Sequence, residues 1–223
     1  DGIRDLVRSR GLGDVYKRQA HLCQHILSER DLEAIYGSMT PDFNAAVLFN
    51  DAVKNRLKHL THFEFELLRP SPFATGFATH NNAWGTDYYA HLYYDTSAQD
   101  IYSTVKIRTL SEEFGISMQR AEDIFEIVVD YLLRVDLGPD FGSLIAEASS
   151  GSAHEEALVE AFAQPVADRV DAISCDEAAE IIRRTAKGFR VVTQMYGKEM
   201  AAHDAPYIRT MASLTLMTAL QCD

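Results

Sequence analysis

Residues 76–91 read GFATHNNAWGTDYYAH, and the spacing of the polar and aromatic residues in this stretch indicates the expected fold. His80, Trp84, Asp87 and His91 fall at i, i+4, i+7 and i+11, so in a helix they share one face. Imidazole, carboxylate and imidazole groups on one face form a typical set of metal ligands. The stretch therefore predicts a helix that contributes one wall of a metal site, with Trp84 packed between the ligands.

Two glycines interrupt the helical pattern of this stretch. Gly76 and Gly85 each cost about 1 kcal/mol relative to alanine inside a helix, so close packing or the site itself has to offset them. A straight helix keeps the four residues on one face. A break at Gly85 would bring Asp87 to the metals by another path.

The first nineteen residues, Asp1 to Gln19, do not read as native protein. Ser9 to Gln19 (SRGLGDVYKRQ) resembles the in-frame translation of a transposase-type sequencing adapter. Residues 1–19 are therefore left out of the fold prediction, as for a vector scar. The expected native part is 20–223, a single domain from a metagenomic fragment whose true N-terminus is missing. The sequence leaves open whether the protein is secreted or cytoplasmic.

The composition narrows the classes of partner. The whole chain has a formal net charge of −12, and setting aside 1–19, with five basic and three acidic residues, leaves −14. Such a surface repels phosphate backbones, so we expect no nucleic-acid binding by charge. No apolar run approaches the roughly 18 to 20 residues that span a membrane. Cys23, Cys175 and Cys222 form no C-x-x-C pair, which argues against a zinc knuckle or a disulfide framework.

The apolar spacing along the rest of the chain is helical. It predicts helices at 20–28, 32–37, 44–69, 101–114, 117–135, 154–162, 165–170, 176–197 and 205–220. Gly37 is expected to end one helix, and Asp176 to cap another. LGPDFG (137–142) and SSGS (149–152) read as breaks. Because no strand alternation and no repeat is found, the predicted fold class is all-α, a single multi-helix domain.

Histidines gather in the first half of the native part, where six of the eight lie between residues 21 and 91. Pro41 disfavours a helical conformation in the residue before it, so Asp42 is expected just past a turn, able to project inward. The candidate metal ligands are His21 (or His25), Asp42, His62 (or His59), His80, Asp87 and His91. These exceed one tetrahedral site, so two or three metals bridged by Asp87 would use them all.

The order of these residues resembles the zinc-dependent phospholipase C family, which is related in fold to the P1-type nucleases. The likeness lies in His21-Leu22, GSMTPDF (37–43), Thr61-His62-Phe63 and GFATHNNAWGTDYYAH (76–91). The resemblance implies an all-α fold and up to three zinc ions that hydrolyse phosphodiesters. It implies that His21 ligates one ion, that Asp42, His62, His80 and Asp87 hold another with Asp87 bridging, and that His91 belongs to a further ion.

Two features depart from the family's pattern. The family's His-x-x-x-Asp becomes a seven-residue step from His80 to Asp87, and its later His-x-x-x-Glu pair is absent, since neither His154 nor His203 has a glutamate four residues on. These departures favour two metals over three. His154 and His203, in acidic and aperiodic surroundings, are expected to be packing or surface residues.

The expected function is zinc-dependent hydrolysis of a small or lipid-like phosphoric ester. Two ions sharing a carboxylate would activate a bridging water and stabilise charge on the phosphoryl oxygens. Asp42 is the candidate catalytic base as well as a candidate ligand. Phe63, Trp84 and Tyr88 are the candidate substrate-binding residues, with an ordinary core role as the alternative.

Two other functions stay open at this point. A helical bundle with Asp87, His91, Glu64 and Glu66 would suit two irons and oxygen chemistry, although the richness in histidine favours zinc. The other alternative is a non-catalytic helical protein that a metal cluster only stabilises. The metal content of the purified protein distinguishes the zinc hydrolase, the diiron protein and the non-catalytic protein.

Overall fold

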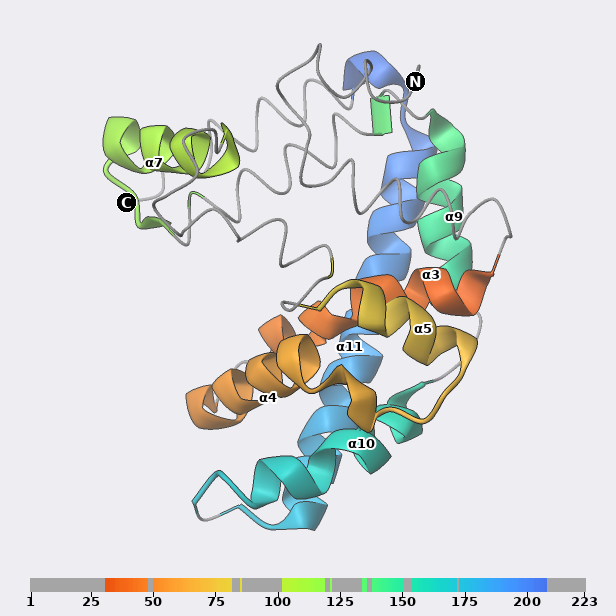
Figure 1. The fold of residues 1–223 in the computed structure, drawn as a ribbon. Helices are drawn as coiled ribbons and strands as arrows, with labels where there is room; N and C mark the ends of the chain where they lie inside the picture. The colour runs from red at the N-terminus through yellow and green to blue at the C-terminus, as the bar shows by residue number, and fades with distance from the viewer. Residues whose placement is uncertain are drawn as a thin grey trace, which may run out of the picture.

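The computed structural model describes residues 31–47, 50–81, 85, 102–118, 121, 134–135, 138–150, 154–171 and 173–207. Within these ranges all regular structure is helical, which confirms the all-α prediction. The elements, labelled as in Figure 1, are α3 (Leu32–Met39), η1 (Thr40–Ala46), α4 (Asp51–Phe63), η2 (Phe65–Leu67), α5 (Pro72–Thr79), α7 (Tyr102–Phe114), α9 (Pro139–Ser150), α10 (Glu155–Ala167) and α11 (Cys175–Ala202).

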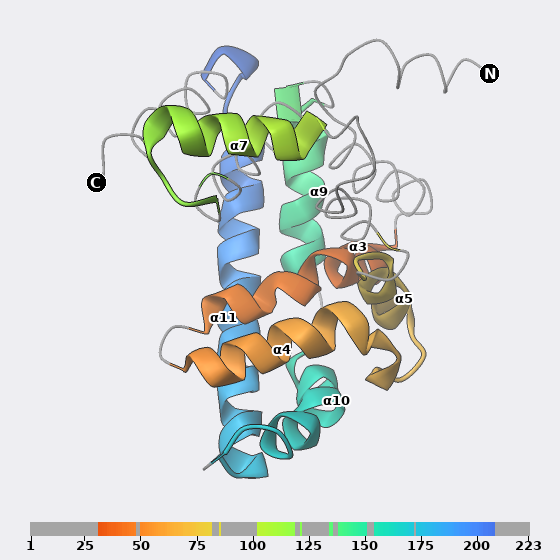
Figure 2. The same cartoon turned by 60° about the vertical axis from the view of Figure 1, so that its left-hand side comes forward.

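The long helix α11 is the axis against which several other elements pack. In Figures 1 and 2, α9 lies along its C-terminal half and α10 against its N-terminal half. The 3-10 helix η1 contacts α11 between them, and α4 packs on η1 and α10. The short helices α3 and α5 contact each other, and α3 also contacts α9. This arrangement brings η1, α4 and the end of α5 together.

The core next to this junction is aromatic. Phe43, Phe73, Phe77 and Phe162 are fully buried, and the Phe77 ring lies 5.9 Å from both Phe73 and Phe162. Burying such a side chain stabilises the fold by about 1.5–3 kcal/mol. Because successive 3-10 residues point about 120° apart, the burial of Phe43 turns the preceding residue, Asp42, away from the core.

Glycines mark the crossing of α3 and α5 rather than a helix end. A Cβ on Gly37 would lie 2.1 Å from the carbonyl oxygen of Phe73, and one on Gly76 would lie 1.8 Å from that of Ala34. The predicted helix end at Gly37 is therefore wrong, because α3 continues to Met39. Close backbone packing offsets the helical cost of Gly76, one of the two explanations expected from the sequence.

Close backbone packing at glycines also joins α9 and α11. A Cβ on Gly142 would lie 2.5 Å from the amide nitrogen of Ala201, and one on Gly197 would lie 2.5 Å from that of Ala146. The break predicted over 137–142 is right only at its start, where Gly138 has φ +85°, because α9 begins at Pro139. The sequence also ended the last long helix at Gly197, whereas α11 runs on to Ala202.

The helix predicted over 44–69 is shorter at both ends. Residues up to Ala46 belong to η1, Val47 is extended, and the Asn50 side chain caps α4 by accepting from the Val53 amide. The sequence did not reveal where α4 starts, because the apolar pattern continues through the capping residue. The helix predicted over 101–114 is confirmed by α7, which begins one residue later.

Two further helix predictions near the C-terminus are wrong. One helix, α10, runs from Glu155 to Ala167 across both predicted segments, with Pro165 inside it. The carbonyl of Pro165 accepts a hydrogen bond from Arg56 Nε at 3.3 Å, which ties α10 to α4. The cap of α11 is Ser174 and not Asp176, because Ser174 and Glu177 form a reciprocal capping box.

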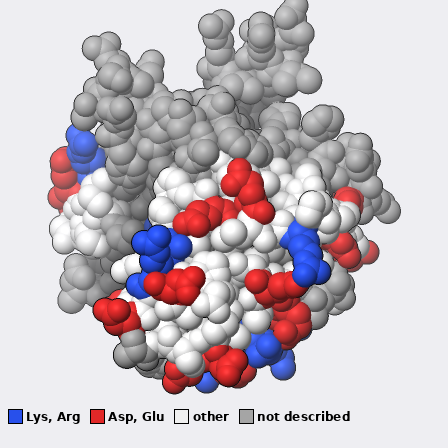
Figure 3. Space-filling view, turned by 60° about the horizontal axis from the view of Figure 1, so that its bottom comes forward, with Lys and Arg blue, Asp and Glu red and all other residues white. Residues whose placement is uncertain are grey.

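The charged side chains are mixed in sign on the face shown in Figure 3. Among the residues described there, basic groups lie beside acidic ones and form no continuous basic patch. The expectation that the protein does not bind nucleic acid by charge stays a prediction. None of the helices described combines the length and the apolar character that a bilayer crossing requires.

Candidate metal centre

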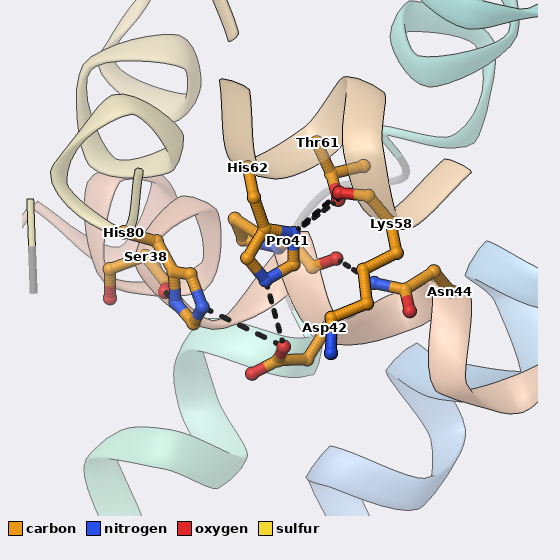
Figure 4. Close-up of polar contacts among 8 residues, drawn as sticks. All are labelled: Ser38, Pro41, Asp42, Asn44, Lys58, Thr61, His62 and His80. Carbon is orange, nitrogen blue, oxygen red and sulfur yellow. Dashed lines mark hydrogen bonds and ion pairs between the residues drawn. The ribbon is translucent and has the colours of Figure 1, made fainter. Parts of the chain in front are cut away.

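Three of the predicted ligands meet at one point. Asp42 lies in η1 and His62 in α4, and His80 is the C-cap residue of α5. The Nε2 atoms of His62 and His80 lie 3.5 and 3.6 Å from the same Asp42 carboxylate oxygen, Oδ1 (Figure 4). One donor atom from each residue lies within 4.8 Å of the other two, so the three residues could hold a metal ion.

The turn that presents Asp42 is built from its neighbours. The Thr40 hydroxyl donates to the Tyr36 carbonyl at 2.7 Å, and the Asn44 amide donates to the Pro41 carbonyl at 2.7 Å, both in buried positions. Thr40 is helical (φ −68°, ψ −28°), so the expected non-helical residue before Pro41 is not found. Proline is tolerated there because the first turn of a helix needs no amide donor from it.

The imidazole of His62 is fixed from its Nδ1 side. This nitrogen lies 2.9 Å from the main-chain oxygen of Lys58, one turn earlier on α4, and 2.8 Å from the Thr61 hydroxyl. A carbonyl oxygen only accepts hydrogen bonds, so Nδ1 carries a proton and Nε2 is the nitrogen that can bind a metal ion. His62 is 2 % exposed, and burial holds the ring in this orientation.

The imidazole of His80 is fixed in the same way from a different segment. Its Nδ1 lies 3.0 Å from the main-chain oxygen of Ser38, so Nδ1 is the donor and Nε2 faces Asp42. Ser38 directly follows Gly37, and His80 comes four residues after Gly76. The close crossing of α3 and α5 at those glycines therefore sets the distance between Ser38 and His80.

The distances from the two imidazoles to Asp42 suit ligands of one metal ion better than hydrogen bonds. Nε2-to-oxygen distances of 3.5 and 3.6 Å exceed the usual hydrogen-bond range. Zinc bound at its normal 2.0–2.2 Å separates two tetrahedral ligands by about 3.3–3.5 Å. Two imidazoles whose second nitrogens bond to main-chain oxygens, together with a carboxylate, are a chemically suitable donor set for a metal ion such as zinc. A zinc ion held by these three described donors would keep a position for water or another ligand.

The carboxylate of Asp42 is charged at neutral pH. Although 56 % of its side-chain surface is accessible, partial burial by itself raises the pKa of this carboxyl. When the two imidazoles are protonated, the charge of His80, the contact and charge of His62, and the charge of Lys58 outweigh that effect and bring the pKa of Asp42 down to about 2. Asp42 is therefore in the form that binds a cation.

The helical face predicted from His80 onward does not start as expected. α5 ends at Thr79, and the amide nitrogens of His80 and Asn81 close the helix on Phe77 and Ala78. The buried Asn81 side chain donates to the Ala78 carbonyl, and the Gly85 amide lies 3.0 Å from the main-chain oxygen of Asn81 and 3.3 Å from its side-chain oxygen. His80 reaches the centre from a helix cap.

The other predicted site residues fall into two groups. His21, Trp84, Asp87, Tyr88, His91 and the alternative ligand His25 lie outside the described residues. Phe63 and His59 are described, and they stack on each other with ring centroids 5.1 Å apart on the outside of α4. His59 is half-exposed and faces Glu64 at 3.4 Å, so of the pair His59 and His62 only His62 joins the cluster.

The two histidines set aside as non-ligands pack against aromatic rings. His154 stacks on Phe73 with ring centroids 4.0 Å apart, and His203 stacks on Tyr207 at 3.8 Å. His203 also contacts Glu199 at 3.0 Å. Their predicted packing and surface roles are confirmed.

The neighbours that orient the cluster were not predicted. The oxygens of Ser38 and Lys58 belong to the main chain, so no residue type signals them. Only the one-turn spacing of Lys58 and His62 on a helix could have pointed to the second.

Comparison with known proteins identifies no relative of the chain. No protein-family model matches the chain, and no curated protein and no solved structure matches it.

Proposed function

We propose that the protein is a zinc-dependent hydrolase of phosphoric esters, phospholipase C-like in its chemistry. The observation that carries the proposal is the convergence of two anchored imidazoles on one carboxylate oxygen of Asp42. Because these side chains are already held in place, they lose little conformational freedom when an ion binds, and the free-energy cost of binding is lower. The order of the ligand types along the chain supports the phospholipase C-like assignment.

A zinc ion at this site would supply a water of lowered pKa and positive charge for a developing phosphoryl oxyanion. The protein's own part is to orient the ion and leave one side of it open. Asp42 combines a low pKa with a carboxylate 56 % exposed, so it accepts a proton poorly and serves better as a ligand than as a general base. Its exposure places the open side of the site toward solvent.

The proposal includes a second ion, held by residues from the rest of the predicted set. Asp87 would bridge the two ions, with His91 and His21 completing the second. Trp84 and Tyr88 would wall the substrate, together with Phe63, whose half-exposed ring directly follows His62. A zinc content of two or more per chain supports this extension, and a content of one restricts the site to Asp42, His62 and His80.

A diiron site built on Glu64 and Glu66 is not favoured. Glu64 is engaged by Arg56 at 3.2 Å and by His59 at 3.4 Å, and Glu66 lies exposed in η2. Neither glutamate belongs to the cluster of Asp42, His62 and His80. Two histidines and one carboxylate also suit a single Fe(II) ion, so metal identity is the first measurement.

The test begins with protein purified without added metal. Elemental analysis is expected to show zinc, and the zinc-loaded protein is expected to hydrolyse a chromogenic phosphodiester. Asp42→Asn should reduce both zinc retention and hydrolysis by more than about 100-fold. Asp51→Asn, which alters an exposed carboxylate in the first turn of α4, should change neither. Iron in place of zinc, with an absorbance change under oxygen, would overturn the proposal.

A further inference from the structure

Lys58 lies beside the candidate metal centre but is not one of its ligands. It precedes His62 by one turn of α4, and its main-chain oxygen anchors the imidazole of that histidine. Its side chain leaves the helix on the same side and runs down to the Asp42 carboxylate (Figure 4). The residue is exposed.

The ammonium of Lys58 is close to Asp42 without being paired to it. Its charge contributes to the low pKa of Asp42, yet no ion pair within 4.0 Å joins the two in the described part of the chain. Other basic side chains near α4 are differently placed. Arg56 pairs with Glu64, and Arg69 pairs with Glu160.

A cation in this position favours an anion between itself and a metal. A protonated amine has no lone pair to give to zinc, and its charge repels the ion. With neutral imidazoles at His62 and His80, a dication, the Asp42 carboxylate and the Lys58 ammonium sum to a net positive charge of about two. A phosphoryl group has several charged oxygens, so it can contact the metal with one and the ammonium with another.

We propose that Lys58 binds a non-bridging oxygen of the phosphoryl group held at the Asp42–His62–His80 centre, and so restricts the substrates to phosphoryl anions. The inference rests on the proposed zinc site. Lys58 is then a substrate-binding residue, in a protein whose net charge of −12 otherwise repels such anions.

Inorganic phosphate is the probe for this role. Its dissociation constant is measured by calorimetry on zinc-loaded wild-type protein, on Lys58→Gln and on Lys58→Arg, after the zinc content of each has been determined. Lys58→Gln is expected to weaken phosphate binding by about tenfold or more, the usual effect of losing a charge-assisted hydrogen bond. Lys58→Arg should stay within about threefold of the wild type, because it keeps the charge.

Lys54→Gln is the matched control. Lys54 lies one turn before Lys58 on the same face of α4, so its loss removes the same charge farther from the centre. The control should leave phosphate affinity within about twofold of the wild type. Zinc affinity should be unchanged or higher in Lys58→Gln, because the side chain is not a ligand and its main-chain oxygen still anchors His62.

The possible results separate the two proposals. Zinc bound normally with equal phosphate affinity in wild type and Lys58→Gln would overturn the role of Lys58 and leave the zinc site standing. An equal loss in Lys54→Gln would also overturn it, since only long-range charge would then matter. Wild-type protein that retains no zinc would overturn the metal site, and the role of Lys58 with it.

Discussion

His62 and His80 lie edge to face, with ring centroids 5.1 Å apart and ring planes at 87°, and both direct Nε2 at one oxygen of Asp42. Each ring is anchored at Nδ1 by a main-chain oxygen, one from α4 and one from α3. The rings therefore cannot turn away without breaking a partly buried hydrogen bond. The donor geometry is built into the fold before any ion binds.

His62→Ala should remove most of the zinc affinity. Loss of one of three described donors, with its lone pair already oriented, is expected to weaken zinc binding by at least about 100-fold. Competition with a chromogenic zinc chelator measures the change. His59→Ala removes a half-exposed histidine three residues away on the same helix and should retain wild-type affinity. Equal losses in both variants would contradict the assignment of His62.

Metal removal should destabilise the fold in proportion to occupancy. An ion that binds only the folded state stabilises it by about 2.7 kcal/mol at 100 times its dissociation constant. Urea unfolding of wild-type protein with zinc and with a chelator should show a difference of about this size. Asp42→Asn should unfold alike under both conditions. A urea midpoint of the wild-type protein that is the same with and without the chelator would show that the native state does not hold zinc.

Gly76→Ala should be strongly destabilising. The new Cβ would lie 1.8 Å from the Ala34 carbonyl oxygen, so α3 and α5 must move apart. We expect a loss of about 3 kcal/mol in the free energy of unfolding, and weaker zinc binding because Ser38 shifts away from His80. Gly188→Ala is the matched control, since its Cβ would meet nothing within 4 Å inside α11. That variant should gain about 0.5–1 kcal/mol.

His154 should make the stability of the fold fall in mild acid. Burial lowers the pKa of His154 by more than the nearby charges of Glu33 and Glu155 raise it. The unfolded chain then binds the proton at higher pH than the folded one, so stability is complete above the unfolded pKa and declines as pH falls through the folded value. The chelator-treated protein should have a lower urea midpoint at pH 5 than at pH 8.

His154→Gln removes this titration and tests the assignment. The midpoint difference between the two pH values should be smaller in the variant than in the wild type, measured in the same chelating buffer. An identical difference in both proteins would show that other groups cause the loss.

The helical class was predictable from the sequence, whereas the role of the glycines was not. Apolar periodicity reports which residues face a core, and it found most of the helices. Gly37, Gly142 and Gly197 were interpreted as helix ends because glycine weakens a helix considered by itself. Each instead lies where two backbones cross at short range, and only the partner helix reveals that. The helix between 139 and 150 was missed for this reason.

The candidate site was partly predictable. Residue type and order along the chain selected Asp42, His62 and His80, which the fold brings together from separate segments. The assumed geometry was wrong for His80, because α5 ends at Thr79 and His80 is its C-cap rather than part of a continuing helix. The charge of Lys58 beside Asp42 depends on how α4 lies against η1, which local sequence does not encode.

The main-chain anchor at Ser38 has an evolutionary consequence. Its carbonyl would be supplied by almost any amino acid, so the ring of His80 places no demand on the side chain at position 38, whose hydroxyl donates to the Ile35 carbonyl at 2.8 Å. The tightly constrained neighbours are Gly37 and Gly76, which bear no functional group at all. A search for relatives of this centre would gain more from matching that pair of glycines than from the chemistry of the residues beside them.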